Sequence, residues 1–252
     1  MSNPIHDLDA GVRRSIADWI GERPETIIAV ATLGSGNGRI WLDGDTATPA
    51  AVLIESTLVP GEPQGFGDAA PLIRLLEQAN GWSCVEVDSR LADAIGDDFE
   101  QRWGIAEIVE DVIHALGEPC AEYSHPLVRQ LTAAETLELP TTAEGVLPDR
   151  RLVATAAEHG RFFAAVEHGI IIGHGGALAA GSLFADVGVH VAKNHRRNGI
   201  AAACASSVCK VLQAEGLVPV WGTSSDNVAS LTVARKLGFV EVARLRYLVR
   251  KS

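Results

Sequence analysis

The chain has 252 residues, of which 47% are hydrophobic and 21% charged, and its formal net charge is −11 at pH 7 with histidine counted as neutral. Such a composition is that of a globular protein with a buried core and room for one or two domains. The negative charge argues against nucleic acid or an anionic membrane surface as the main partner, and it mildly favours cationic substrates.

Cysteine usage and the lack of targeting signals predict a reduced, cytoplasmic protein. Cys84, Cys120, Cys204 and Cys209 have neither the spacing of a metal site nor a C-x-x-C pattern. The chain opens without the basic start and apolar core of a signal peptide. The uncharged run 169–185 is interrupted by glycine and histidine, so it predicts a hairpin and not a membrane span.

The first elements along the chain are predicted to be a helix and then a hairpin. Residues 12–20 carry apolar side chains at helical spacing, with Asp7 or Asp9 available as the N-cap. A strand is expected over 26–32, followed by a glycine-rich turn at 34–38 that leads into a return strand. Because this glycine cluster precedes a strand and not a helix, a hairpin turn is favoured over a phosphate loop.

Strands and helices are then expected to alternate. The expected elements are a strand over 51–59, a helix from Pro71 capped by Gly81, a strand over 82–87, and a helix over 91–103 that ends at Gly104. The next segment, 105–116, fits a strand or a helix by periodicity alone.

A link at 118–126 introduces the second half. The expected elements are a strand over 128–131, a helix from 133, a loop at 140–148 that borders a substrate entrance, and strands over 162–166 and 170–184. His168 and His174 are interpreted as turn histidines and not metal ligands, because no third ligand has a matching spacing.

The most informative stretch is a strand, a basic turn and a helix between 186 and 216. Apolar Val187, Val189 and Val191 alternate with Asp186, Gly188 and His190, which is a strand pattern. From Ile200, apolar residues recur at helical spacing up to a predicted cap at Gly216. A glycine-containing turn at the N-terminus of a helix, here with two arginines, is suited to bind an anion and above all a phosphate.

The segment after Gly216 makes the pattern specific. A second strand is predicted over 218–223, and Asn227 leads into a short helix closed by the K-L-G-F sequence at 236–239. The ordered set R-x-x-G-x-A (196–201), N-x-x-S (227–230) and K-L-G-F resembles the GNAT superfamily of acetyl-CoA-dependent N-acetyltransferases.

That resemblance implies a site. In the family, the R-x-x-G-x-A turn cradles the CoA pyrophosphate, and the strands on either side of the following helix splay apart around the pantetheine arm. The residues that would bind acetyl-CoA are Val189, Val191, Arg196, Arg197, Asn198, Gly199, Ile200, Ala201 and Asn227. No metal is expected.

The resemblance also implies catalytic residues. Asp186 lies where histone-acetylating members carry a glutamate base, whereas His190 on the same predicted face is a residue type with a reference pKa of about 6.5. We expect Asp186 to be the base, with His190 assisting it through a water molecule. Many members carry a tyrosine acid seven residues after the asparagine, but here that position is Ala234. Ser230 matches the N-terminal acetyltransferases in which a serine contacts the CoA sulfur, and it is equally a common residue type at a helix start.

An internal similarity predicts two halves. R-W-G-I at 102–105 corresponds to K-L-G-F at 236–239, and the segment 64–69 corresponds to the turn at 196–201. The predicted fold class is α/β (mixed α+β): two tandem GNAT-like halves, each a twisted mixed sheet flanked by helices, with domains at 1–120 and 121–252. By this repeat 105–116 is mostly strand.

The first half is predicted to be a degenerate copy that serves as scaffold and pocket wall. Its turn carries Gln64 and Asp68 in place of Arg196 and Ile200, with Glu62 nearby, and acidic groups repel a pyrophosphate.

The sequence therefore predicts an N-acetyltransferase that moves acetyl from acetyl-CoA to a primary amine of a small molecule or peptide. A catalytically silent acyl-CoA-binding or scaffold protein of the same descent is the alternative, favoured by Ala234 and the degenerate first half. We expect no nucleic-acid or membrane partner, and a homodimer is left open.

Overall fold

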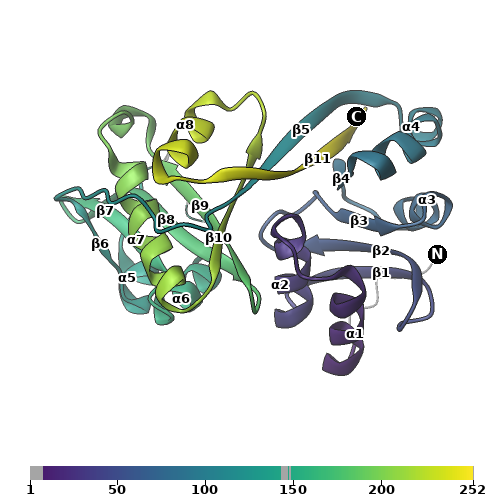
Figure 1. The fold of residues 1–252 in the computed structure, drawn as a ribbon, viewed down its shortest axis with the longest axis horizontal. Coiled ribbons are helices and arrows are strands. Elements are labelled where there is room, and N and C mark those ends of the chain that lie inside the picture. The colour runs from purple at the N-terminus through teal and green to yellow at the C-terminus, as the bar shows by residue number, and fades with distance from the viewer. Residues whose placement is uncertain (1–7, 143–146, 148, 252) are drawn as a thin grey trace. The chain divides into compact units, whose positions relative to one another are not determined.

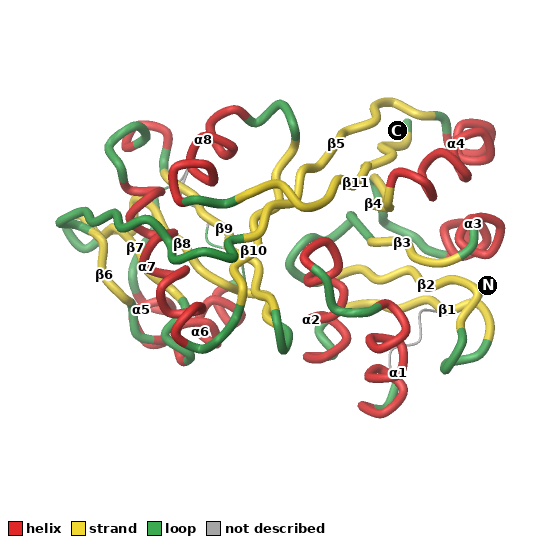
Figure 2. Tube along the Cα trace, in the orientation of Figure 1, coloured by secondary structure: helices red, strands yellow, loops and turns green. Residues whose placement is uncertain are grey.

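A computed structural model describes residues 8–142, 147 and 149–251 (Figures 1 and 2). The chain forms two compact units. The first extends to Ile113 and also contains Ser224–Asp226 and the segment from Ala243 onwards. The second contains His114–Thr223 and Asn227–Val242.

The first unit begins with two helices and ends in alternating strands and helices. Its elements are α1 (Ala10–Ile20), a 3-10 turn η1 (Pro24–Thr26), α2 (Ile27–Ser35), β1 (Gly38–Gly44), β2 (Pro49–Ser56), β3 (Gln64–Gly67), α3 (Ala69–Gln78), β4 (Cys84–Asp88), α4 (Ser89–Trp103) and most of β5 (Ile105–Ala115).

The second unit has the same plan. Its elements are β6 (Val128–Gln130), α5 (Ala133–Glu138), α6 (Arg150–Glu158), β7 (Phe162–Glu167), β8 (Ile170–Ala180), β9 (Phe184–Val191), a 3-10 turn η2 (Lys193–His195), α7 (Ile200–Ala214), most of β10 (Val218–Ser224), α8 (Val228–Leu237) and the start of β11 (Val240–Arg250).

The repeat predicted from sequence is confirmed by element order and by strand pairing. Apart from β6 at the start of the second half, each half of the sequence runs helix, helix, three strands, helix, strand, helix, strand. In the first, β1–β2 and β2–β3 pair antiparallel and β3–β4 pair parallel. In the second, β7–β8 and β8–β9 pair antiparallel and β9–β10 pair parallel. The chain thus has two GNAT-like halves with mixed sheets, and 105–115 is a strand as the repeat implied.

The last strand of the chain belongs with the first unit. Residues Leu245–Val249 of β11 pair antiparallel with Cys84–Asp88 of β4, and Leu248 is buried in the same core as Val85 and Trp82. In the second unit, the Leu116 N–H, just beyond β5, donates a hydrogen bond to the carbonyl of Pro219 in β10. Each unit is therefore completed by a segment that is distant in sequence, and the boundary at residue 120 stays a prediction.

Helix α7 packs closely on β8 and β9 because glycines in β8 leave room for it (Figure 1). A Cβ atom on Gly173 would lie 3.0 Å from Ile200, and one on Gly175 would lie 3.0 Å from Cys204. Val187 and Val191 of β9 are buried on this side. The predicted apolar face of β9 is thus the face that α7 covers.

One sequence prediction is wrong at 26–38. The segment expected to be a strand is helix α2, and Gly36 ends this helix in the left-handed conformation at φ 72°. The run I-I-A-V-A-T-L is short and apolar all round, and such runs do not distinguish a buried strand from a buried helix. The glycine-rich segment is therefore a helix C-terminus and not a hairpin turn.

Other boundaries also differ. The run 170–184 is not one strand, since β8 ends at Ala180 and β9 begins at Phe184. The C-terminal caps predicted at Gly81 and Gly216 lie at Ala79 and Glu215. Helix α6 was not predicted.

Asp9 does cap α1, accepting from the Gly11 and Val12 N–H groups, whereas Asp7 lies outside the described residues. The loop predicted at 140–148 and the opening residues of the chain fall largely outside them too. No helix within the described part of the chain is long and apolar enough to cross a membrane.

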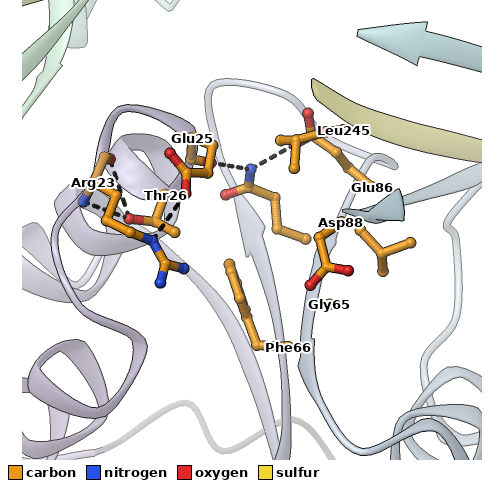
Figure 3. A pocket seen from close by; sticks show the side chains of 10 residues that line it. Arg23, Glu25, Thr26, Gly65, Phe66, Glu86, Asp88 and Leu245 are labelled. Atoms are coloured by element: carbon orange, nitrogen blue, oxygen red, sulfur yellow. Dashed lines mark hydrogen bonds and ion pairs between the residues drawn. The ribbon is translucent and has the colours of Figure 1, made fainter. Parts of the chain in front are cut away.

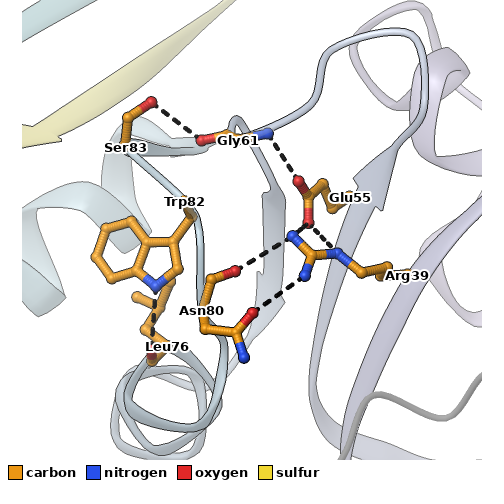
Figure 4. A network of polar contacts seen from close by, with 7 residues as sticks. All are labelled: Arg39, Glu55, Gly61, Leu76, Asn80, Trp82 and Ser83. Atoms are coloured by element: carbon orange, nitrogen blue, oxygen red, sulfur yellow. Dashed lines mark hydrogen bonds and ion pairs between the residues drawn. The ribbon is translucent and has the colours of Figure 1, made fainter.

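A polar network joins β1, β2 and the end of α3 in the first unit (Figure 4). The Arg39 guanidinium forms an ion pair with Glu55 and donates to the Asn80 carbonyl, 3.2 Å away. The other Glu55 oxygen accepts from the Gly61 N–H at 2.7 Å. Because Glu55 is buried, this pairing holds the loop before β3 in place.

If the C-terminal strand is part of the first core, Leu248→Ala should lower the free energy of unfolding by roughly 2–5 kcal/mol, the usual cost of a cavity at a fully buried leucine. Leu248 is 1% exposed. Val242→Ala, at a β11 position that is 49% exposed, should change the free energy of unfolding by less than about 0.5 kcal/mol. Urea unfolding measures both, and equal effects would contradict the assignment of β11.

Candidate functional site

The strands β9 and β10 are paired only at their beginnings. Phe184, Ala185 and Asp186 pair in parallel with Val218, Pro219 and Val220. Within the described residues the pairing stops there, although β9 continues to Val191. The expectation that these two strands splay apart is confirmed.

Beyond Asp186, the edge of β9 that faces away from β8 pairs with no other strand among the described residues. The Ala192 N–H donates to the Ile172 carbonyl of β8. Because successive backbone groups along a strand point to opposite edges, the N–H groups of Val189 and Val191 point away from β8. These are the two strand residues that the resemblance assigned to cofactor binding.

Beyond β9, the chain turns into α7 through two left-handed residues. Arg197 has φ 66° and Gly199, the N-cap residue of α7, has φ 85°. The Arg196 Nε donates to the Val191 carbonyl at 3.0 Å, which fixes the start of the turn to the end of β9.

The N-terminus of α7 presents donors to solvent. The first hydrogen bond within the helix runs from the Ala203 N–H to the Gly199 carbonyl at 3.0 Å, so the N–H groups of Ile200, Ala201 and Ala202 precede it. Arg196, Arg197, Asn198 and Gly199 are all exposed. The turn therefore combines free N–H groups, the positive end of a helix dipole and two guanidinium groups, which is an arrangement suited to a phosphate.

Asp186 and His190 lie on the face of β9 opposite α7, and both are half-buried. Asp186 is the last residue paired with β10, at the apex of the split, whereas His190 is one residue from the end of the strand. Four residues of extended strand span about 13 Å, so we do not expect a direct hydrogen bond between these two side chains.

His174 is not a turn histidine, as the sequence suggested, but a buried residue of β8. It lies opposite His190 in the antiparallel register, and its ring stacks between those of Phe162, at 5.4 Å, and His190, at 6.0 Å. Neither ring nitrogen has a hydrogen-bond partner among the described residues. Burial, with a smaller contribution from His190, lowers the pKa of His174 to about 4, so it is neutral at physiological pH.

The residues at the start of α8 already have structural roles. The Asn227 Oδ1 accepts from the Ser230 N–H at 3.1 Å and so caps the helix. Trp221 Nε1 donates to Ser230 Oγ at 2.9 Å. Ala234, at the position of the family's tyrosine, is 0% exposed within the core of the second unit, so the site has no phenol there.

The first unit has no counterpart of the basic turn. The segment 64–69, predicted to be a turn, is strand β3 followed by Asp68 alone before α3 begins. A Cβ on Gly67 would lie 2.3 Å from the Ala50 carbonyl oxygen, and φ at Gly67 is 98°. The backbone approaches too closely here to leave a cradle for a pyrophosphate.

The first unit nevertheless has a cavity of about 220 Å³ at the corresponding place (Figure 3). β3 and β4 pair only at Gln64 and Glu86, and the cavity lies against the residues that follow in both strands. Its lining residues are Arg23, Glu25, Thr26, Gln64, Gly65, Phe66, Glu86, Val87, Asp88 and Leu245. Sequence reasoning missed this cavity, although a glutamate between Val85 and Val87 was a signal of a buried charge.

A set of acidic side chains gathers around Glu86. Burial, followed by repulsion from Asp111, raises the pKa of Glu86 to about 8. Hydrogen bonds from Gln64 and Tyr247 lower this pKa, but by less. Burial and the charge of Glu62 raise the pKa of Asp111 to about 6. Within the described part of the chain, no lysine or arginine forms an ion pair with Glu62, Glu86 or Asp111.

The described residues contain neither a metal-binding cluster nor a disulfide. No group of three or more histidine, cysteine or acidic side chains is placed to hold a metal ion. The four cysteines are buried and form no disulfide, and Cys204 and Cys209 both lie on α7.

The raised pKa of Glu86 predicts a pH dependence of stability. Because its folded-state pKa of about 8 lies above the unfolded value of 4.5, the contribution is greatest below pH 4.5 and is lost as the pH rises to 8. The full difference is on the order of 5 kcal/mol. Glu86→Gln should therefore lose much less stability between pH 5 and pH 8.5 than the unmodified chain, whereas Glu107→Gln, at an exposed position of β5, should behave like the unmodified chain. Urea unfolding at both pH values measures this, and parallel losses in all three proteins would refute the charge assignment.

A model of the GNAT acetyltransferase family matches residues 153–248. No curated protein matches the chain significantly. The matched range runs from α6 to β11 and includes the strand pair and the basic turn described above.

Solved structures match nearly the whole chain. A GCN5-related N-acetyltransferase-like protein from Streptococcus suis has a TM-score of 0.62 at 18% identity, covering 96% of this chain and 99% of that one. An acetyltransferase of the GNAT family from Colwellia psychrerythraea has a TM-score of 0.60 at 15% identity, covering 94% and 97%. A tandem GNAT protein from the clavulanic acid biosynthesis pathway has a TM-score of 0.55 at 14% identity, covering 94% and 93%.

At these identities the structural likeness shows the fold alone, whereas the family model adds a match in sequence. Together they support a general acetyltransferase role. Residues 153–248 thus carry a GNAT acetyltransferase domain, and the chain as a whole has a tandem GNAT fold.

Proposed function

We propose that the domain at 121–252 transfers acetyl from acetyl-CoA to a primary amine of a small molecule or peptide. The observation that carries this proposal is the split between β9 and β10, which leads directly into the unpaired N-terminus of α7. A split of this kind offers a slot with free backbone groups on one side and a phosphate-binding turn at one end.

The residues present fit acetyl-CoA. The N–H groups at the start of α7, with Arg196 and Arg197, would hold the pyrophosphate, and Gly199 supplies the left-handed turn without a side chain. The open-edge N–H groups of Val189 and Val191 would bond the amide groups of the pantetheine arm. The thioester would then lie toward the apex of the split.

This proposed placement favours one of the two candidate bases over the other. If the pyrophosphate lies at the turn after Val191, the apex at Asp186 is the end where the acyl group arrives, and His190 lies near the phosphate end. Asp186 is therefore the proposed base, and His190 is an alternative to it and not its partner.

The transfer balances with these groups. The amine nitrogen, once its extra proton has passed to Asp186 or to water that Asp186 binds, attacks the thioester carbonyl carbon. The oxyanion formed is stabilised by backbone N–H donors. The oxyanion then collapses and the C–S bond breaks, so the CoA thiolate leaves. The attacking nitrogen gives up its second proton, through water, to this thiolate, and the products are the amide and the free CoA thiol.

Ser230 is the proposed contact for that thiolate. Because its oxygen accepts from Trp221, its own hydrogen remains to be donated to the sulfur. The alternative function, a catalytically silent acyl-CoA-binding protein, is favoured by the buried Ala234 in place of a tyrosine.

The phosphate site is tested by Gly199→Glu, which should abolish acetyl-CoA binding by bulk and negative charge. A side chain at Gly199 meets no atom within 4 Å, so the fold should survive, with the strain of a positive φ as the main cost. Isothermal titration calorimetry with acetyl-CoA measures the affinity.

Two controls separate strain from charge. Gly199→Ala carries the same strain without the carboxylate and should bind within about tenfold of the unmodified chain. Gly216→Glu places the same side chain at another open, positive-φ glycine, at the far end of α7, and should bind normally. Unchanged affinity in Gly199→Glu would refute the site. Gly67→Glu is unsuitable as a control because its Cβ would collide with the backbone at Ala50.

The reaction is tested by release of free CoA thiol in the presence of a panel of primary amines. Release with at least one amine supports the enzyme, whereas binding of acetyl-CoA without release across the panel supports the silent protein. Asp186→Asn should lower kcat by a factor of 10²–10⁴, the usual contribution of a general base, and leave acetyl-CoA affinity unchanged.

The pH–rate profile tests whether His190 or Asp186 is the base. His190→Gln should keep most of kcat if Asp186 is the base, and should remove the acid limb of the profile if His190 is. A limb near neutral pH cannot come from His174, whose pKa is about 4. Wild-type rates and profiles in both variants would show that neither residue removes the proton.

A further inference from the structure

The cavity of the first unit has the chemistry of a site for a small cation. Of its charged lining residues, Arg23 and Glu25 form an ion pair at 2.9 Å and so offset each other. Asp88 and Glu86 remain, and neither has a basic partner among the described residues. The unbalanced charge of the cavity is therefore negative once Glu86 ionises.

Gln64 adds an acceptor that the protein does not use. This residue is 6% exposed and lines the cavity. Its Nε2 donates to Glu86 Oε2 at 2.5 Å, whereas its Oε1 is buried and has no hydrogen-bond partner among the described residues. A buried acceptor without a donor costs free energy unless a ligand or water provides one.

The remaining walls are apolar. The apolar lining comes from three strands: Phe66 lies in β3, Val87 in β4 and Leu245 in β11. In Figure 3, Phe66 and Leu245 lie on different sides of the cavity. At about 220 Å³ the cavity is far larger than the roughly 10–15 Å³ that one water needs. It is large enough for an alkyl chain of a few carbons with one polar head group.

We propose that the first unit binds a small primary alkylammonium ion in this cavity, with Gln64 Oε1 and the Glu86 carboxylate accepting from the ammonium group and Phe66, Val87 and Leu245 packing on the alkyl chain. Asp88 at the exposed rim attracts the cation. An ammonium group has three hydrogen-bond donors and one positive charge. It would therefore give Gln64 Oε1 a donor and the Glu86 carboxylate a positive partner. This proposal does not depend on acetyl transfer in the second unit.

An acyl-CoA is a poor fit for the same place. Asp68 stands before α3 where the second unit has its basic turn, and Gly67 leaves no room beside Ala50. In this proposal the first unit shares the split strand pair of the second unit but binds a cation where the second unit binds an anion.

Binding should be linked to protonation. Glu86 is faced by Gln64 from β3, by Cys84 on its own strand, by Tyr247 from β11, by Asp111 from β5 and by Glu62 from the loop before β3, with Asp88, Arg23 and Glu25 at the cavity itself. Because its pKa is about 8, Glu86 must lose a proton when the cation binds at pH 7. Affinity should therefore rise by nearly tenfold per pH unit between pH 6 and pH 7.5 and level off above pH 8.

The test is isothermal titration calorimetry of the full chain with n-butylammonium, in the absence of acetyl-CoA. Titrations in phosphate and in HEPES, which differ in ionisation enthalpy, give the number of protons released. We expect one ligand per chain, release of close to one proton at pH 7, and no binding of n-butanol. Methyl NMR shifts should change at Val87 and Leu245 and not at Val187, which places the ligand in the first unit.

Glu86→Gln keeps the shape of the side chain and should weaken n-butylammonium binding at pH 8 by tenfold or more, with no proton release. Asp97→Asn removes one exposed carboxylate of the same unit and should bind within twofold of the unmodified chain. Circular dichroism confirms that both variants are folded. Failure of the unmodified chain to bind, equal binding of n-butanol, or an unaffected Glu86→Gln variant would each overturn the proposal.

Discussion

A pair of parallel strands bonded over only three residues is the constraint on which the second unit depends. Where β9 and β10 separate after Asp186 and Val220, the open edge of β9 pairs with no strand in the described part of the chain. Unpaired groups are costly if they are buried and useful if a ligand satisfies them. Helix α7 packs on β8 and β9, where Gly173 and Gly175 leave room for it, and its N-terminus follows the end of β9.

The two halves show how one backbone plan can support opposite electrostatics. At the end of the third strand the second unit places Arg196, Arg197 and an exposed helix N-terminus, whereas the first places Asp68 and a glycine packed on Ala50. In the strand after the helix, the first unit carries Glu86 where the surrounding residues are apolar. A fold sets where a site lies, and a few side chains set the sign of the charge that it accepts.

Sequence reasoning identified most of this architecture because its signals were local. The alternating valines at 187–191 predict a strand, and Asn227 with K-L-G-F at 236–239 predicts a short helix, each from adjacent residues. The repeat then identified 105–115 as a strand. Residues 27–35 were misassigned because a helix buried on most sides has no polar face to reveal its period. His174 and the cavity beside Gln64 depend on contacts between strands distant in sequence, which no local pattern contains.

The separation of Asp186 and His190 limits any mechanism for the second unit. Two titratable groups on one face of a strand look like an acid–base pair in the sequence, but four residues of extended chain put about 13 Å between them. In the proposed mechanism the phosphate lies at the basic turn next to His190, so the thioester lies toward Asp186. The proposal therefore places proton removal and phosphate binding at opposite ends of β9, with the pantetheine arm between them.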